Sequence, residues 1–162
     1  MQIAKSFGAH VTGLCSIRNA EMVRSIGADR LIDYTQQDFT KNRNRYHLIF
    51  DLVVNHPLST CRRVLNPNGI WVFAGIQAVT TLTALLFRTL DALQSQKIVS
   101  LMASFNKADL NLIRKLMEAA NVTPVIDRLY SLNEVFETVR YPSKRYARGK
   151  VTITAIVGGI PL

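Results

Sequence analysis

An apolar stretch near the middle of the chain constrains the fold more than any other feature. Residues 47–54 are almost continuously apolar apart from Asp51, and polar residues bound the run on both sides. Because a run of this length is too short for a typical helix, it predicts a strand that is buried on both faces of a sheet. A second apolar run covers residues 70–74 and is closed by Gly75.

The segment between these two runs predicts a short helix followed by a turn. Pro57 suits the first turn of a helix. Residues 66–69 have the sequence Asn-Pro-Asn-Gly, which is typical of a turn. Strand, helix, turn and strand together form a crossover between parallel strands. Ligands of parallel sheets bind at the carboxyl ends of the strands, so we expect a site near Val54, Asn55, Ala74 and Gly75.

The rest of the chain alternates between helical and extended patterns. Helices are expected at residues 1–7, 19–27, 80–95, 110–121 and 131–140. Asn19 would cap the second helix, which stops at Gly27, and a Ser131/Glu134 capping box would begin the last one. Leu110, Ile113 and Met117 would form the inner face of the helix at 110–121. Strands are expected at residues 10–15, 31–32, 98–103, 124–130 and 151–157. The alternation predicts an α/β fold, with an open, mostly parallel sheet of the nucleotide-binding type and flanking helices.

Length and composition exclude several classes of protein. A chain of 162 residues with 48% hydrophobic content can bury one substantial core, so a single domain is expected. No apolar run reaches the roughly 18 residues of a membrane span, and residues 1–5 do not resemble a signal peptide, so we expect a cytoplasmic protein. Cys15 and Cys61 belong to no metal-binding spacing, which predicts two reduced thiols and no metal site.

The net charge of +9 would suit a polyanionic partner such as nucleic acid or a membrane surface. The basic residues are dispersed, however, and they lack the interleaved aromatic residues of a base-stacking surface. We therefore expect neither a nucleic-acid nor a membrane partner. We expect a solvated basic surface, and the alternative for part of it is a site for a phosphorylated small ligand.

Six segments carry a resemblance to a known family. In chain order, these segments are QIAKSFGAHVTGLCS, SIGADRLIDYT, FDLVVN, LNPNGIWVFAG, VTPVIDRLYSLNEVFETVRY and ARGKVTIT. In this order, they resemble the C-terminal half of the medium-chain dehydrogenase/reductases. Within that superfamily they are most similar to the quinone oxidoreductase-like and zinc-type alcohol dehydrogenase-like proteins. The resemblance covers nearly the whole chain. It implies a Rossmann-like dinucleotide-binding domain over residues 1–162, in which residues 122–162 form the return segment toward a catalytic domain.

The resemblance also implies that parts of the family's fold are missing here. In the family, a first strand and a glycine-rich turn precede the segment that matches residues 1–5, and a catalytic domain with most substrate contacts precedes both. The first strand lies at the centre of the usual strand order. We therefore expect a truncated sheet that has a gap, closes by pairing new neighbours, or borrows a strand from another chain. A fragment of this kind is expected to be inactive alone, and to meet a small-molecule substrate only when the missing domain is supplied.

The family resemblance implies an adenosine side for a cofactor site. Ser16, Arg18 and Asn19 resemble the loop that receives the 2′-phosphate of NADP(H), where an acidic residue would bind the ribose of NAD. Arginine and serine suit a phosphate because they donate hydrogen bonds without adding repulsion. The alternative for Arg18 is a solvated loop residue. Tyr34 matches a tyrosine near the adenosine phosphate, with a packing role as the alternative.

On the nicotinamide side, the family's strand ends match Val54, Asn55, Ala74 and Gly75. Val54 departs from the pattern because a glycine is common there, and its side chain opposes close approach of the cofactor. Phe105 would bound the nicotinamide pocket, and Lys150 would either reach the cofactor phosphates or simply begin the last strand. No catalytic residue is nominated, since His47 and His56 have no nucleophile or carboxylate at motif spacing.

The sequence leaves two other functions open. FDLVV followed by RVLNPNGIWVF resembles two strands of an S-adenosylmethionine-dependent methyltransferase, although the last two family segments have no place in that fold. The other alternative is a noncatalytic dimerisation remnant. A homodimer through residues 98–103 is expected, because the resemblance places this strand at a sheet edge and the run has neither charge nor proline. Burial beneath the preceding helix is the competing expectation for this strand.

Overall fold

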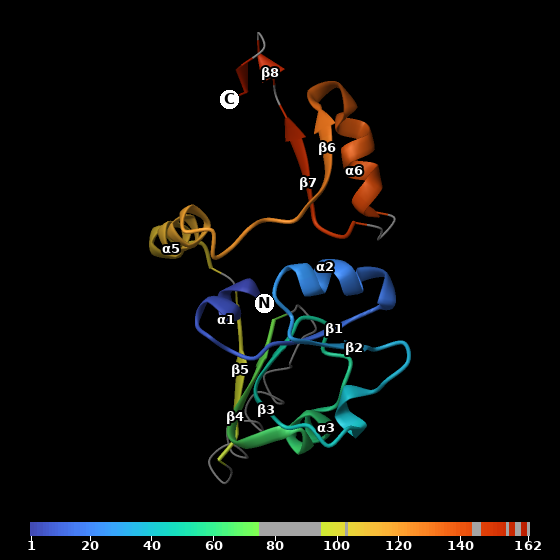
Figure 1. Cartoon of the computed structure of the whole chain (residues 1–162), viewed down its shortest axis with the longest axis vertical. Coiled ribbons are helices and arrows are strands. Elements are labelled where there is room, and N and C mark those ends of the chain that lie inside the picture. Colours follow the sequence, from blue (N-terminus) through green and yellow to red (C-terminus); the bar gives the residue numbers. More distant parts are fainter. Residues whose placement is uncertain (75–94, 103, 144–146, 155, 158–159, 162) are drawn as a thin grey trace. The chain divides into compact units, whose positions relative to one another are not determined.

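The computed structural model describes residues 1–74, 95–102, 104–143, 147–154, 156–157 and 160–161. The expected helix at 80–95, Gly75 and Ala103 therefore lie wholly or mostly outside the described residues. The chain divides into two compact units, which are Met1–Asp33 with Ala108–Leu162, and Tyr34–Lys107. Figure 1 labels the elements of both units.

The first unit begins with a helix and a parallel strand pair. α1 (Gln2–Ser6) precedes β1 (Thr12–Cys15), and the turn η1 (Ile17–Asn19) and α2 (Ala20–Ser25) lead to β2 (Arg30–Asp33). β1 and β2 are parallel, with Cys15 opposite Asp33. A Cβ on Gly13 would lie 2.5 Å from Val23 Cγ1, so only glycine lets α2 approach β1 this closely. The apolar side chains of Cys15, Val23 and Ile32 are buried there.

The return segment completes the first unit. α5 (Lys107–Glu118) precedes it, and the segment contains β6 (Ile126–Ser131), η3 (Leu132–Glu134), α6 (Val135–Ser143), β7 (Lys150–Thr154), β8 (Ile156–Val157) and β9 (Ile160–Pro161). β6 and β7 are parallel, and β8 and β9 form a short antiparallel pair. The predicted capping box is confirmed, since the Ser131 N–H donates to Glu134 Oε2 at 2.9 Å. Gln2 Nε2 donates to the Thr123 carbonyl at 2.8 Å, which ties α1 to the segment before β6.

The second unit contains the predicted crossover. β3 (Tyr46–Asp51), α3 (Leu58–Arg63), β4 (Leu65–Phe73) and β5 (Lys97–Ser100) follow the short turn η2 (Phe39–Lys41). The three strands form one parallel sheet in the order β3-β4-β5. Its buried core consists of Cys61, Leu65, Trp71 and Phe73, and Ile49, Val54 and Ile98 pack against it.

Two details of the crossover differ from the prediction. β3 ends at Asp51 and not at residue 54, because Asp51 Oδ1 accepts the N–H groups of Val53 at 3.0 Å and Val54 at 2.8 Å and turns the chain. The predicted turn at 66–69 lies inside β4, where the register with β3 shifts. Asn68 has a φ of 64°, so this segment bends as a turn would while the strand continues.

Two predictions about helices are wrong. Asn19 precedes α2, but its side chain makes no capping hydrogen bond, and its backbone at φ −103° and ψ 1° is not extended as a capping residue requires. The apolar face of α5 is not an inner face, because no residue of this helix is buried within the described structure. Leu110, Ile113 and Met117 are 59%, 42% and 44% exposed.

The predicted fold class is confirmed as α/β with parallel strands and flanking helices. Among the described residues, no strand pair joins β1–β2 to β3–β4–β5, and β6–β7 forms a further separate sheet. How the missing central strand is compensated, by a gap, by new pairing or by a borrowed strand, stays a prediction.

Candidate functional site

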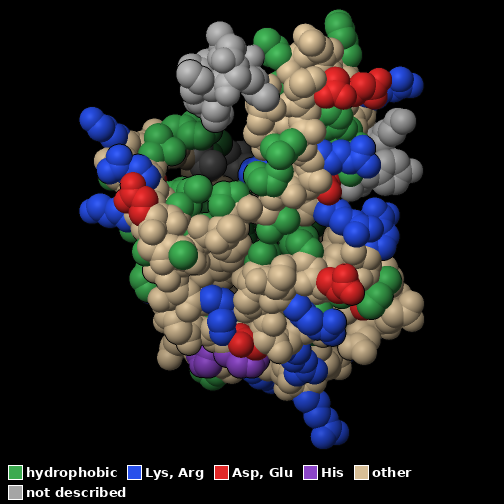
Figure 2. Space-filling view, turned by 45° about the horizontal axis from the view of Figure 1, so that its top comes forward, with side chains coloured by type: hydrophobic (Ala, Val, Ile, Leu, Met, Phe, Trp, Pro, Cys, Tyr) green, Lys and Arg blue, Asp and Glu red, His purple; other side chains and the backbone are tan. Residues whose placement is uncertain are grey.

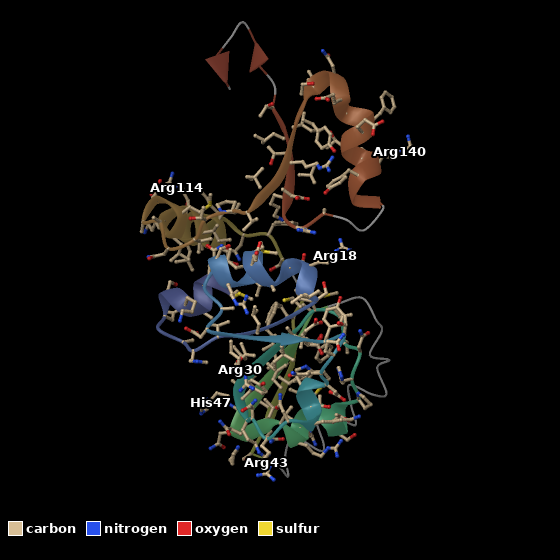
Figure 3. All side chains as sticks on the ribbon, turned by 45° about the vertical axis from the view of Figure 1, so that its right-hand side comes forward. Arg18, Arg30, Arg43, His47, Arg114 and Arg140 are labelled. Carbon is tan, nitrogen blue, oxygen red and sulfur yellow. The ribbon has the colours of Figure 1, made fainter. Side chains whose placement is uncertain are left out.

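The loop predicted to receive a phosphate begins where β1 ends. Ser16 follows the strand in an extended conformation, with φ −77° and ψ 157°, and starts the turn η1. This turn projects Arg18 at the carboxyl end of β1 (Figure 3). Arg18 is exposed, and its side chain lines a cavity in the first unit. The carboxyl end of a parallel strand is where ligands of such sheets bind.

The cavity has a volume of about 500 Å³. Its described lining consists of Arg18 from η1, Asp127 and Arg128 from β6, Tyr141 from α6, and Arg148 just before β7. This lining includes three arginines and one aspartate, so the described walls carry net positive charge. Such a cavity suits an anion that accepts several hydrogen bonds.

Hydrogen bonds and stacking hold the walls of the cavity in place. Asp127 Oδ2 accepts hydrogen bonds from the Tyr141 hydroxyl and from the backbone N–H of Arg148, both at 3.0 Å. The Arg128 guanidinium carbon lies 4.1 Å from the centroid of the Tyr141 ring, which is a cation–π contact. Tyr141 therefore connects the two neighbouring charged residues of β6.

Hydrogen bonds and nearby groups favour the ionised forms of Asp127 and Arg128. The backbone N–H of Arg148 lowers the pKa of Asp127, and the Tyr141 hydroxyl and nearby arginines lower it further. A hydrogen bond with Tyr130 raises the pKa of Arg128, as does the neighbouring Tyr141. Asp127 is consequently an acceptor within the wall, and Arg128 remains a cation.

The other residues predicted for the adenosine side are placed as follows. Asn19 lies beside Arg18 in η1, and its Oδ1 atom is buried without a hydrogen-bond partner among the described residues. Tyr34 follows β2 directly and is 59% exposed. Lys150 begins β7, and its N–H donates to the Val125 carbonyl at 2.7 Å. Of the predicted cofactor residues, only Arg18 is among the described residues that line the cavity.

The residues predicted for the nicotinamide side lie in the second unit. Val54 and Asn55 follow β3, and the N–H of Ala74 after β4 donates to the Asp51 carbonyl at 2.9 Å. Val54 has a φ of 55°, which a β-branched residue rarely adopts and glycine adopts freely. Phe105 is 98% exposed, and Gly75 lies outside the described residues. The backbone at Val54 thus keeps a conformation suited to glycine.

The sequence reasoning missed the cavity residues of the return segment, Asp127, Arg128, Tyr141 and Arg148. One signal was present, because Asp127 and Arg128 are adjacent charges in an otherwise mostly apolar strand. No sequence spacing relates them to Arg18, which lies more than a hundred residues earlier.

Two searches of the described residues concern metals and membranes. No three His, Cys, Asp or Glu side chains in the described ranges are grouped so that they could hold a metal ion. The described residues therefore do not fit a zinc ion. No described helix is long and apolar enough to cross a membrane. Figure 2 shows lysine and arginine side chains spread among apolar ones on the visible face.

Comparisons with known proteins agree with this fold. A family model described as zinc-binding dehydrogenase matches residues 26–153. A mitochondrial NAD(P)H oxidoreductase of Mus musculus is 30% identical over 96% of this chain and 44% of its own length. A chloroplastic quinone oxidoreductase of Triphysaria versicolor is 26% identical over 94% of this chain and 47% of its own length. The structure of the quinone oxidoreductase from Coxiella burnetii matches with a TM-score of 0.70 and 24% identity, over 93% of this chain and 46% of that one.

These matches place the chain against the C-terminal half of the relatives, as the resemblance implied. The chain spans about half the length of the curated relatives it matches. The family model covers most of the chain, including the crossover, the capping box and most of β7. The chain therefore belongs to the zinc-binding dehydrogenase family, within the medium-chain dehydrogenase/reductase superfamily of oxidoreductases.

Proposed function

We propose that this chain is the NADP(H)-binding portion of an oxidoreductase that acts on quinones, enals or alcohols. The observation that carries the proposal is the position of Arg18, at the carboxyl end of β1 and in the wall of a cationic cavity. Family membership supports a nicotinamide cofactor in general. The basic loop supports NADP(H) in particular, because no acidic residue stands between Cys15 and Ala20 to bind a ribose diol.

Cofactor preference tests this proposal. NADPH is expected to bind more tightly than NADH, and Arg18→Ala should weaken NADPH by about 1.5 to 3 kcal/mol while leaving NADH nearly unchanged, because one charge-assisted contact to the 2′-phosphate is lost. Isothermal titration calorimetry with both cofactors measures the difference between their binding free energies. Arg114→Ala is the matched control, since Arg114 lies on α5 and pairs with Glu118 outside the cavity. Equal weakening of both cofactors by Arg18→Ala would contradict the proposed role.

The remaining predicted residues have proposed roles along the same cofactor. Ser16 and Asn19 would hydrogen-bond the 2′-phosphate region, and Tyr34 would lie near the adenosine. The nicotinamide half would run along the strand ends that carry Val54, Asn55, Ala74 and Gly75, with Phe105 bounding it and Lys150 near the phosphates. The exposed positions of Tyr34 and Phe105 leave both side chains accessible to a ligand.

We further propose that the 162-residue chain does not oxidise NADPH by itself. Hydride transfer requires a substrate held against the nicotinamide. The described residues offer no group to which we can assign that role, and the relatives are about twice as long as this chain. A steady-state assay with quinones, enals and alcohols should therefore give the background rate of NADPH oxidation. Oxidation that scales with protein concentration would show that the chain is sufficient.

Partners and location are part of the proposal as well. A homodimer through residues 98–103 is supported by the position of β5, which is an outer strand of its sheet among the described residues. A cytoplasmic location stays a prediction, because the relatives in Mus musculus and Triphysaria versicolor are named mitochondrial and chloroplastic. Family membership sets aside the methyltransferase alternative. A noncatalytic dimerisation remnant is the surviving alternative, and it should bind neither NADPH nor NADH in the titration.

A further inference from the structure

We infer that Arg128 and Arg148 of the return segment complete, together with Arg18, a binding site for a phosphomonoester dianion. The inference rests on the proposed function only for the source of the phosphate, which is expected to be the 2′-phosphate of NADP(H). The site itself stands on the arrangement of the cavity walls.

The three arginines converge on one cavity from separate parts of the chain. Arg18 comes from η1 after β1, Arg128 from the middle of β6, and Arg148 from the residues before β7. Tetrahedral phosphate oxygens accept hydrogen bonds from several directions, and the planar guanidinium group binds them with paired donors. Guanidinium groups that approach from different elements therefore suit a phosphate better than a row of arginines on one helix would.

The single carboxylate of the described lining has hydrogen-bond donors of its own. Asp127 already accepts the Tyr141 hydroxyl and the Arg148 backbone N–H. Arg128 lies over the Tyr141 ring, which orients its guanidinium without neutralising it. Asp127 and Tyr141 thus connect Arg128 and the backbone of Arg148 in one wall of the cavity.

Charge and size both favour a nucleotide phosphate over a simple monovalent anion. Three arginines and one aspartate leave an excess of two positive charges in the described lining. A phosphomonoester carries about −1.5 to −2 at pH 7, which nearly balances this excess. The volume of about 500 Å³ lies within the range of small-molecule sites and exceeds what a single small ion fills.

Calorimetric titration of the 162-residue chain tests the site with three probes, which are adenosine 2′,5′-bisphosphate, 5′-AMP and inorganic phosphate. Arg128→Gln and Arg148→Gln should each weaken the bisphosphate by about 10- to 100-fold and change 5′-AMP by less than about twofold. Arg114→Gln, the charge-matched control on α5, should change neither. Circular dichroism establishes that each variant is folded. Arg128→Lys and Arg148→Lys keep the positive charge but lose the paired N–H donors of the guanidinium group. They replace any glutamine variant that does not fold.

The outcomes separate this inference from the proposed function. If wild-type protein prefers the bisphosphate and Arg18→Ala removes the preference while Arg128 and Arg148 variants keep it, the three-arginine site is overturned and the cofactor proposal survives. If the bisphosphate and 5′-AMP bind equally but inorganic phosphate binding depends on Arg128 and Arg148, the site stands and NADP(H) is not its source. If none of the three probes binds, both the three-arginine site and the cofactor proposal are overturned.

Discussion

Two non-glycine residues with positive φ, Val54 and Ala120, follow regular elements, and they differ in the burial of their side chains. Val54 adopts φ 55° in the turn that follows β3, where Asp51 Oδ1 accepts its N–H at 2.8 Å. Ala120 adopts φ 56° after α5, where its N–H donates to the Met117 carbonyl at 3.0 Å. A left-handed backbone costs a non-glycine residue about 1 to 2 kcal/mol. At Val54 the side chain packs against the core, whereas at Ala120 it is exposed.

Ala120→Gly should therefore stabilise the protein. Glycine adopts the left-handed conformation at a helix end without the steric cost, so the free energy of unfolding is expected to rise by about 1 kcal/mol. Urea denaturation followed by circular dichroism measures the change.

Ala119→Gly is the matched control for this substitution, because the Ala119 N–H keeps a helical hydrogen bond to the Lys115 carbonyl at 3.0 Å. Glycine should destabilise this neighbouring position by about 0.5 to 1 kcal/mol. Destabilisation of similar size by both changes would show that Ala120 carries no backbone strain.

At the scale of elements, the junction between β6 and α6 depends on its capping box. Glu134 Oε2 accepts hydrogen bonds from the Ser131 N–H at 2.9 Å and the Ser131 hydroxyl at 2.8 Å. These bonds satisfy a donor that the start of a helix would otherwise leave unpaired. They also lower the pKa of Glu134, with the backbone N–H of Ser131 as the largest cause.

Glu134→Ala should lower the melting temperature at pH 7. Because the pKa of Glu134 is lower in the folded chain than in the unfolded one, its contribution is fully present above the unfolded value, about 4.3. That contribution is lost as the pH falls through the folded value. Thermal unfolding at pH 7 and pH 3 should show the difference between variant and wild type shrinking in acid. Glu137→Ala, in the first turn of α6 but outside the box, is the control. A difference that persists unchanged at pH 3 would argue against the carboxylate cap.

Local sequence patterns predicted this level of structure well, but they did not predict contacts between residues that lie far apart in the sequence. Ser131-x-x-Glu134 predicted its helix start because both partners lie within one turn. Asn19 did not cap α2, because its backbone had already entered the helical turn η1. Arg18 could be recognised from its place after a strand, whereas Arg128 and Arg148 meet it only through the tertiary fold. The exposed apolar face of α5 was misjudged because helical periodicity identifies a face but not what covers it.

At the scale of the whole molecule, the sheets leave edges that a longer or assembled protein could use. β3 and β5 are the outer strands of the β3-β4-β5 sheet, and β1 pairs only with β2 among the described strands. An open edge exposes unpaired backbone groups, and charged residues or proline usually protect it. β5 and the residues after it carry little such protection, since Lys97 is the sole charge between residues 97 and 102.

A homodimer through residues 98–103 is the final prediction. Val99, Leu101 and Met102 are 42%, 45% and 92% exposed in the single chain, and Leu101 continues the pairing of β5 by donating to the Phe73 carbonyl at 2.8 Å. Antiparallel pairing of two such edges across a two-fold axis would satisfy the free backbone groups and cover the exposed side chains. Leu101→Lys should shift the dimer toward monomer in sedimentation velocity, because each interface would then contain two uncompensated ammonium groups. Leu112→Lys places the same charge on α5, at a leucine that is 52% exposed, and should leave the dimer intact. Wild-type protein that sediments as a monomer at high micromolar concentration would rule this interface out, and dissociation by Leu112→Lys alone would place the interface on α5 instead.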